Sequence, residues 1–251
     1  MPEQFVRHLR RADDFINLAV SATARALELS GGTDVEPVKQ GVFVGTAFGP
    51  LETNFSSLGS LVDEGEGQMS PTLFSHSVLN SAAGYISQLF NCHGPALTIT
   101  SYGWPFLYAL QEARQALING GISRAFVIGA EIYSALLADA YERLFDSPPT
   151  WSPSAVAWVL DIQGNGPFLK EIRITERGAL PDNYLCRANE TWHGSGLSAK
   201  KGHLNPLTHA EVMTRALNKA TKHDQGELVW SFNASFGEAE VSVYLGRSFS
   251  E

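Results

Sequence analysis

Cysteine is scarce in this sequence, since only Cys92 and Cys186 occur among its 251 residues. Two cysteines are too few for a disulfide framework, and their separation fits no metal-binding motif. Disulfide-rich secreted scaffolds and zinc modules are therefore excluded, and we predict no metal and no cofactor. We expect both thiols to be small buried apolar groups in a reducing, cytoplasmic environment.

Long apolar runs and a basic face are also missing. No run approaches the roughly 20 residues needed to cross a bilayer, and the N-terminus has basic residues but no apolar secretory-signal core. The formal net charge is -8, and the sequence shows no clustered Lys/Arg face. We therefore predict no membrane span and no nucleic-acid partner.

What is present is a pattern of helices and strands that predicts one α/β domain. The apolar spacing predicts a helix between Phe5 and Leu29, and the strand-helix-strand order around residues 96–130 predicts a parallel crossover. Residues 181–207 predict irregular structure. The remaining expected elements are strands at 41–46 and 125–130, two strands at 155–160 and 169–174 joined by a turn at 163–167, a helix at 209–222, and paired closing strands at 228–232 and 241–245.

The most informative segment runs from Gly94 to Gly103 and predicts a buried strand that enters a tight turn. A helix is expected from about Phe106 to Asn119, so the layout is that of a nucleophile elbow. Gly103 stands where a nucleophilic side chain is expected, and glycine supplies none. We expect the neighbouring aromatic residues to fill the space that a substrate would enter, namely Tyr102, Trp104 and Phe106.

This segment resembles the β-ketoacyl synthase branch of the thiolase superfamily, in which Gly-Pro-x-x-Thr-Val-x-Thr-Ala-Cys places the acyl-accepting cysteine at the turn. Further landmarks keep the family's order from Arg11 to about Ile174, and residues 233–237 resemble its closing Asn-Ser-Phe-Gly segment. The resemblance implies an α/β, thiolase-like layered fold. It also implies a shortened, single domain over residues 1–251: mostly the N-terminal ketosynthase half, with a truncated C-terminal half that ends in a strand pair.

The chemistry of that family is not expected here. A decarboxylative condensation needs a thiolate, two histidines and an oxyanion hole, and Gly103 cannot carry an acyl group. Glu238 and Glu240 replace the family's Gly-Gly-Thr-Asn segment, and a carboxylate would oppose a developing oxyanion. His193 resembles a family histidine, but its acidic neighbour is missing, so its role stays open.

The resemblance therefore implies a catalytically inactive subunit, like the chain length factors of heterodimeric ketosynthases. It implies an active β-ketoacyl synthase as partner, fatty-acid-like or polyketide biosynthesis as the setting, and an aryl polyene pathway as the narrower assignment. Because the chain is acidic, we expect acyl carrier protein to dock on the partner. Leu73 and Phe74 are the implied tunnel-gating residues, and the implied cross-dimer strand consists of Ala96, Leu97, Thr98, Ile99, Thr100 and Ser101.

Two other functions stay open from the residues alone. Ser101 lies two residues before the turn and pairs in principle with a histidine, as in an acyl-thioester hydrolase or transferase. The local sequence departs from Gly-x-Ser-x-Gly, however, and favours a serine bonded to the backbone. The third possibility is a stand-alone acyl-binding scaffold protein.

Overall fold

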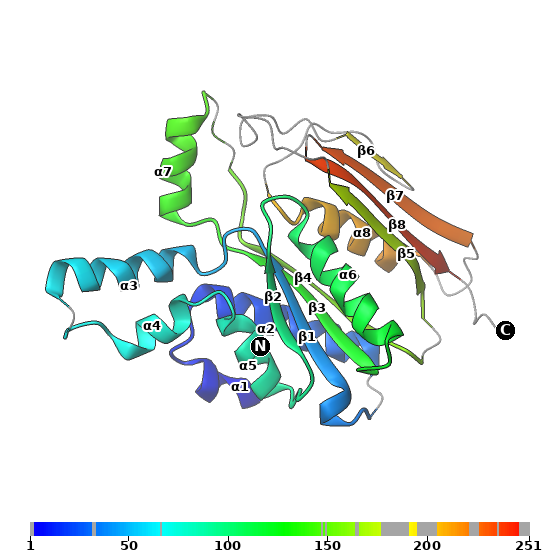
Figure 1. Ribbon diagram of the computed structural model, residues 1–251, viewed down its shortest axis with the longest axis horizontal. Coiled ribbons are helices and arrows are strands. Elements are labelled where there is room, and N and C mark those ends of the chain that lie inside the picture. The colour runs from blue at the N-terminus through cyan, green and yellow to red at the C-terminus, as the bar shows by residue number, and fades with distance from the viewer. Residues whose placement is uncertain are drawn as a thin grey trace.

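Two four-stranded sheets form the framework of the part of the chain that the structure describes, a computed structural model (Figure 1). The described residues are 3–31, 34–65, 67–146, 148, 150–163, 166–176, 191–194, 205–220, 226–234 and 236–245. The strands are β1 (Gln40–Thr46), β2 (Ala96–Thr100), β3 (Arg124–Glu131), β4 (Ser154–Asp161), β5 (Phe168–Glu176), β6 (Thr191–Gly194), β7 (Gly226–Ala234) and β8 (Gly237–Leu245).

Helices cover and separate these sheets. They are α1 (Glu3–Leu9), α2 (Asp14–Ser30), α3 (Leu51–Glu64), α4 (Pro71–Ser77), α5 (Ser81–Leu89), α6 (Pro105–Ile118), α7 (Ala135–Leu144) and α8 (Thr208–Lys219), with a short 3-10 turn at Pro37–Lys39. The expected helices after the elbow and near residue 209 are confirmed, whereas α7 was not anticipated.

The first sheet has the order β2-β1-β3-β4, in which β1 pairs in parallel with both β2 and β3, while β4 is antiparallel to β3. Every residue of β1 and β3 is buried, as expected for continuous apolar runs in the interior of a parallel sheet. The predicted parallel crossover through α6 is therefore confirmed. β2 lies at the edge of this sheet and is only partly buried.

The second sheet is antiparallel, with the order β5-β8-β7-β6. The predicted closing pair is confirmed as β7 and β8. The two strands expected at 155–160 and 169–174 are confirmed as β4 and β5, and they belong to different sheets, because β4 pairs with β3 and β5 pairs with β8. The chain therefore passes from one sheet to the other between Asp161 and Phe168. The segment expected to be irregular also contributes β6 to this sheet.

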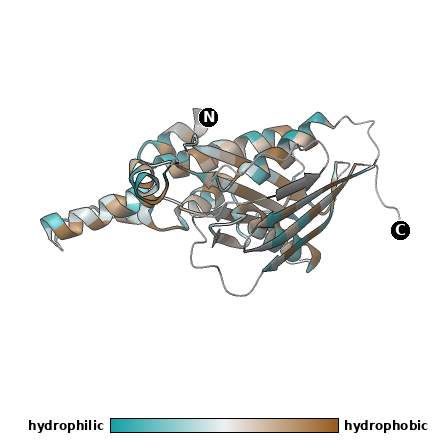
Figure 2. Ribbon diagram, turned by 90° about the horizontal axis from the view of Figure 1, so that it is seen from above, coloured by the Kyte–Doolittle hydropathy of each residue, from teal (hydrophilic) through white to brown (hydrophobic). Residues whose placement is uncertain are grey.

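The layers follow from which apolar faces are buried. On one side of the first sheet, α2 and α5 pack over β1, β3 and β4 around a core that contains Phe15, Ile86 and Phe126. On the other side, α6 and α8 lie between the two sheets, and one apolar cluster joins Phe43 of β1 to Trp230 of β7. By contrast, α3 extends away from these layers (Figures 1 and 2).

The N-terminal region forms two helices, not the single helix that its apolar spacing predicts. Asp13 begins α2 as its N-cap, and its carboxylate accepts a hydrogen bond of 2.9 Å from the Ile16 amide. An aspartate in this position satisfies an otherwise unpaired amide, so it favours a helix start over continuation from α1. In the described ranges, no helix has the length and apolar character to span a bilayer.

Candidate functional site

The elbow itself is present. β2 ends at Thr100, α6 begins at Pro105, and Trp104 between them has φ 54° and ψ 42°, a left-handed conformation that is rare outside glycine. Gly45 of β1 lets this turn approach closely, since a Cβ there would lie 2.9 Å from the Phe106 amide nitrogen. Backbone strain of this kind is typical of functional turns. The strand-turn-helix layout of an elbow is therefore present, with its left-handed residue at Trp104, directly after Gly103.

The space beside Gly103 is filled by Phe236, which lies in the turn between β7 and β8. A Cβ added to Gly103 would lie 2.7 Å from Phe236 Cε1 and nearer still to Cζ, distances that real Cβ atoms do not adopt. Even an alanine therefore does not fit unless the phenyl ring moves. The Phe236 ring therefore occupies the volume that a side chain at position 103 would need.

An aromatic wall surrounds this ring. The Trp104 and Phe236 ring centroids are 4.4 Å apart, and Trp104 also packs on Phe232 at 6.4 Å. His209 of α8 lies edge-on to Phe232 at 5.8 Å, and burial lowers the pKa of His209 to about 3. This histidine is therefore neutral at physiological pH and belongs to the packed interior.

The three aromatic residues that were predicted to fill the elbow differ in their burial. Trp104 and Phe106 are fully buried, as expected, and Phe106 packs edge-on against Trp158 at 5.2 Å. Tyr102 is a correction, because 62% of its surface is exposed and its ring lies 6.0 Å from Phe48 instead of in the elbow. The residue that fills the space, Phe236, is distant in sequence and was not singled out from the pattern.

The alternative nucleophile Ser101 and the thiol of Cys92 both lie in environments that do not favour reaction. The Ser101 hydroxyl donates a 2.6 Å hydrogen bond to the Gly103 carbonyl, and the Ser101 amide donates to Thr46 O at 3.2 Å. Ser101 is thus bonded to the backbone, as its local sequence favours, which weakens the hydrolase alternative. Cys92 is buried, and this burial raises the pKa of its thiol to about 11. Cys186 lies outside the described residues.

The expectation that Glu238 and Glu240 place a carboxylate at the oxyanion position needs correction. Glu238 and Glu240 alternate along β8 with buried Ala239, so both of their side chains are exposed. The Glu238 carboxylate accepts a 3.2 Å hydrogen bond from the Asn233 amide group. These carboxylates therefore do not enter the elbow. The backbone of His193 pairs with Ser231 in β6, but its side chain lies outside what the structure describes.

A buried polar network beside the elbow was not predicted. Glu131 at the end of β3 is fully buried, and its carboxylate accepts hydrogen bonds from the Ala47 amide, the Phe48 amide at 3.2 Å and the Thr46 hydroxyl at 3.1 Å. Burial raises the pKa of Glu131 to about 8, against the opposing effect of these hydrogen bonds. A glutamate directly after the apolar run 125–130 was the available sequence signal.

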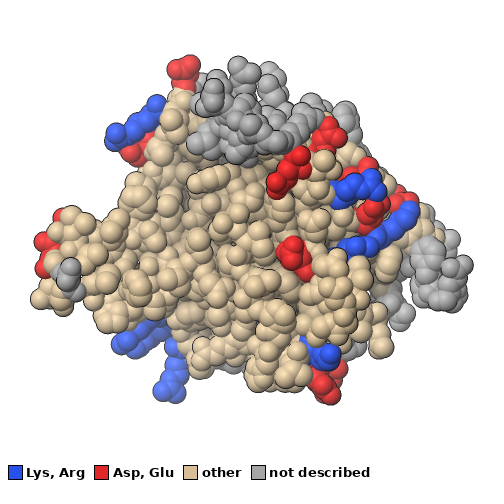
Figure 3. Space-filling view, in the orientation of Figure 1, with Lys and Arg blue, Asp and Glu red and all other residues tan. Residues whose placement is uncertain are grey.

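A second feature is a broad face with few charged side chains (Figure 3). It includes the exposed edge of β2, where Leu97 protrudes, and α4, where 53% of the Phe74 surface is exposed and Leu73 is half-buried. The projecting helix α3 buries only Ser57. Its exposed apolar residues and those after α4 are Phe55, Leu58, Val62, Val78 and Leu79. We call α3, α4 and the β2 edge, with these side chains, the apolar face.

Comparison with known proteins identifies the family. Residues 2–143 match the family described as "Beta-ketoacyl synthase, N-terminal domain". This match covers more than half of the chain, so the chain belongs to the β-ketoacyl synthase family.

Its curated relatives include "3-oxoacyl-[acyl-carrier-protein] synthase 2" of Vibrio harveyi, 27% identical over 133 residues, and the same enzyme of Vibrio cholerae serotype O1, 27% identical over 142 residues. The matches cover 52% and 55% of this chain, but only 32% and 34% of the relatives. The chain thus spans about a third of the length of the curated relatives that it matches.

Solved structures share the fold over nearly the whole chain. The ishigamide ketosynthase/chain length factor gives a TM-score of 0.71 at 17% identity, covering 95% of this chain and 82% of that one. A ketosynthase (ApeO) in complex with its chain length factor (ApeC) from Xenorhabdus doucetiae gives 0.57 at 19% identity, covering 95% and 80%. The expected thiolase-like α/β fold is therefore confirmed.

The fit between Gly103 and Phe236 is testable by a double-mutant cycle. We expect Gly103→Ala to lower the free energy of unfolding by about 1–3 kcal/mol, because the added methyl group overpacks the elbow. In a Phe236→Ala background the same change should cost less than about 0.5 kcal/mol. Denaturant unfolding measures both values. Gly84→Ala is the control, since a Cβ there meets nothing; equal costs in both backgrounds would contradict the steric account.

The Glu131 network predicts a pH dependence of stability. Its folded-state pKa of about 8 lies above the ordinary 4.5, so ionisation opposes folding. The stabilising contribution of the protonated group is complete below pH 4.5 and is lost as the pH rises through about 8. Relative to Glu131→Gln, the wild-type free energy of unfolding should therefore fall across this range. If the free energy of unfolding depended on pH in the same way in both proteins, the prediction would be wrong. As a control, Glu142→Gln at an exposed position should leave the pH dependence of the wild-type protein unchanged.

Proposed function

We propose that this chain is a non-catalytic, chain-length-factor-like partner of an active β-ketoacyl synthase. One observation carries the proposal: the position of the acyl-accepting nucleophile is a glycine whose missing side chain is replaced in space by the Phe236 ring. Formation of an acyl thioester requires a thiolate with room for its substrate, and position 103 supplies neither. The strained elbow is kept, so the fold retains the scaffold of a catalytic site without its chemistry.

The apolar face supports a role inside a complex. Large contiguous apolar surfaces on a folded chain typically mark sites of association. Helix α3 is the clearest case, because Val62 is 74% exposed on a helix that projects away from both sheets. An isolated helix with several exposed apolar side chains gains little stability from this chain alone. A partner that covers α3 and α4 would remove these side chains from water.

The exposed edge of β2 indicates where the partner would bind. Among the described strands, β2 pairs only with β1, and its other edge carries unpaired backbone groups. An edge strand of this kind accepts another strand readily. We propose that Ala96 to Ser101 lie against the equivalent strand of the ketosynthase, which makes the complex a heterodimer.

The gating role that we propose for Leu73 and Phe74 is steric. Phe74 is exposed in the middle of α4, and Ser70 caps this helix by accepting a 3.3 Å hydrogen bond from the Leu73 amide. An aromatic side chain that enters the partner's acyl tunnel would limit how far a growing chain extends. The ketosynthase would supply the cysteine and histidines and also the main dock for acyl carrier protein.

The structural neighbours favour the same assignment. Two of them are described as a ketosynthase with a chain length factor, and a third, a type II polyketide acyl carrier protein with its ketosynthase, gives a TM-score of 0.65 at 14% identity. We propose fatty-acid-like or polyketide biosynthesis as the pathway class, with an aryl polyene pathway as the narrower assignment and the cytoplasm as the location.

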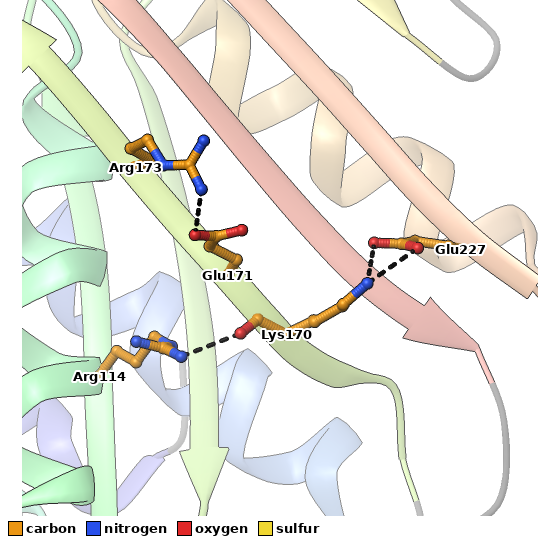
Figure 4. Close-up of polar contacts among 5 residues, drawn as sticks. All are labelled: Arg114, Lys170, Glu171, Arg173 and Glu227. Carbon is orange, nitrogen blue, oxygen red and sulfur yellow. Dashed lines mark hydrogen bonds and ion pairs between the residues drawn. The ribbon is translucent and has the colours of Figure 1, made fainter.

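We also propose that residues 1–251 form one ketosynthase-like domain. The support is the shared core between the sheets and the polar links on the outside of α6 (Figure 4). Arg114 of α6 donates to the Lys170 carbonyl of β5 at 2.9 Å, and the Lys170 ammonium meets Glu227 of β7 at 3.1 Å. The first contact attaches α6 to β5 of the second sheet, and the second joins β5 to β7 across β8.

Co-expression tests the proposed complex. We expect the chain to aggregate when produced alone and to co-purify with an active ketosynthase from the same biosynthetic system. Replacing Leu97 by aspartate should abolish co-purification, because the charge would be buried at the strand pairing. Leu29→Asp is the matched control, since Leu29 is an exposed apolar residue of α2 outside the apolar face. Condensation or acyl-adduct formation by the purified chain alone would disprove the proposal.

The gating role predicts a change in product length without loss of turnover. In the intact complex, Phe74→Ala should extend the product distribution, because removal of the ring lengthens the tunnel. Mass analysis of the released products measures this shift, and Leu29→Ala serves as the control. An unchanged distribution from an intact Phe74→Ala complex would rule out gating by this side chain.

A further inference from the structure

The helices α3 and α4 form an arm that carries much of the apolar face. α3 packs along α4, the Asn54 side-chain amide donates to the Ser77 carbonyl at 3.3 Å, and α3 projects away from both sheets (Figures 1 and 2). We call α3 and α4 together the arm. At the end of α4 the arm is joined to α5, because His76 Nε2 lies 2.9 Å from the Tyr85 hydroxyl oxygen. Its other attachment to the layered part of the protein is the start of α3.

The start of α3 is fixed neither by its own sequence nor by close packing. Its N-cap residue is Pro50, whose side chain supplies no hydrogen bond to the first amides of the helix. The helix buries only Ser57, and a cavity of about 280 Å³ lies between its first turn, Phe15 of α2 and Ile132 after β3. Contacts from other elements therefore determine the orientation of α3.

One such contact comes from Asp13, the N-cap of α2. One oxygen of its carboxylate accepts the hydrogen bond from the Ile16 amide, and the other accepts a 2.7 Å hydrogen bond from the Thr53 hydroxyl. Thr53 lies in the first turn of α3, so this carboxylate joins the N-termini of two helices. A carboxylate is attracted to the positive end of each helix dipole, and a hydrogen bond to a charged acceptor is stronger than one between neutral groups.

A second contact comes from Glu131 at the end of β3. Its buried carboxyl group accepts hydrogen bonds from the Thr46 hydroxyl and from the two backbone amides that follow Thr46. The same Thr46 hydroxyl oxygen accepts a 2.8 Å hydrogen bond from the Gly49 amide. The three residues after β1 are thus each bonded to Glu131, directly or through Thr46, and this fixes the path of the chain into α3.

We propose that Asp13 and Glu131 are positioning residues for partner binding, because they hold the arm in the orientation that presents its apolar side chains and Phe74 to the ketosynthase. The identity of this partner rests on the proposed function, whereas the hold on the arm is a property of this chain. Since hydrogen bonds and not close packing fix the start of α3, loss of one of them should release the arm without unfolding the two sheets. A released arm has to be ordered again on binding, and this lowers affinity.

Hydrogen exchange followed by mass spectrometry tests the hold on α3 in the co-purified complex. Thr53→Val removes the hydroxyl that bonds Asp13 but keeps the shape and the helix propensity of the side chain. The amides of α3 should exchange about tenfold faster, as expected for loss of one hydrogen bond to a charged group, while those of β7 and β8 keep their rates. Thr53→Ser keeps a hydroxyl and should restore wild-type exchange. Ser60→Ala is the matched control, since the Ser60 hydroxyl bonds the Ser57 carbonyl within α3 at 2.9 Å.

Partner affinity and product length give the second measurement. Thr53→Val should weaken ketosynthase binding by about tenfold, and Glu131→Gln should weaken it as well, because its amide group places N–H donors opposite backbone N–H groups. In complexes that still form, both variants should broaden the distribution of product lengths, since Phe74 is held less firmly. Ser60→Ala should change neither affinity nor product length.

Three results would overturn the proposal. They are equal exchange of α3 in wild type and Thr53→Val, equal exchange in Thr53→Val and Thr53→Ser, and unchanged affinity and product length in a Thr53→Val complex whose α3 exchanges faster. If no ketosynthase binds the wild-type chain, the proposed function fails instead. The same exchange measurement on the chain alone then decides whether the two carboxyl groups hold the arm.

Discussion

The fit of the Phe236 ring over Gly103 is the constraint on which the rest of the site depends. A glycine at the elbow would otherwise leave a void beside Trp104, and voids in a packed interior cost free energy because their lining loses contacts. The ring removes that void, and in doing so it leaves no room for a side chain at Gly103. One packing contact therefore both fills the interior and excludes a larger residue from this position. The strained Trp104 backbone persists because the surrounding aromatic wall holds it.

The layered fold makes this contact possible. The elbow comes from the first sheet, where β2 runs into α6, and Phe236 comes from the turn at the end of the second sheet. The helices α6 and α8 lie between the sheets, so the turn of β7 and β8 is brought back against the start of α6. On the opposite side of the elbow, Glu131 fixes the turn after β1. Packed aromatic rings and a buried, hydrogen-bonded carboxyl group thus lie next to the elbow, while the exposed apolar side chains lie on α3, α4 and the edge of the sheet.

The sequence predicted the elements whose signals are local. The apolar runs of β1 and β3 and the helix α6 were predicted because burial on both sheet faces and helical periodicity leave clear patterns. The prediction of a single N-terminal helix was wrong because Asp13 caps a new helix within a continuous apolar spacing. Glu238 and Glu240 were misplaced because a motif alignment fixes their position along the strand but not which face they occupy. The strands that pair with β4 and β5 could also be identified only from the folded structure.

The sequence by itself determined the family resemblance, the absence of a nucleophile at Gly103 and the acidic character of the chain, since these are properties of residue identity and order. Only the tertiary structure decided that Phe236 fills the vacant space, that Tyr102 is exposed, and that Trp104 packs against Phe232. These features join residues far apart in the chain, and their contacts arise from packing of whole layers. No spacing along the sequence encodes such contacts directly, because side-chain neighbours across layers are selected by shape and burial.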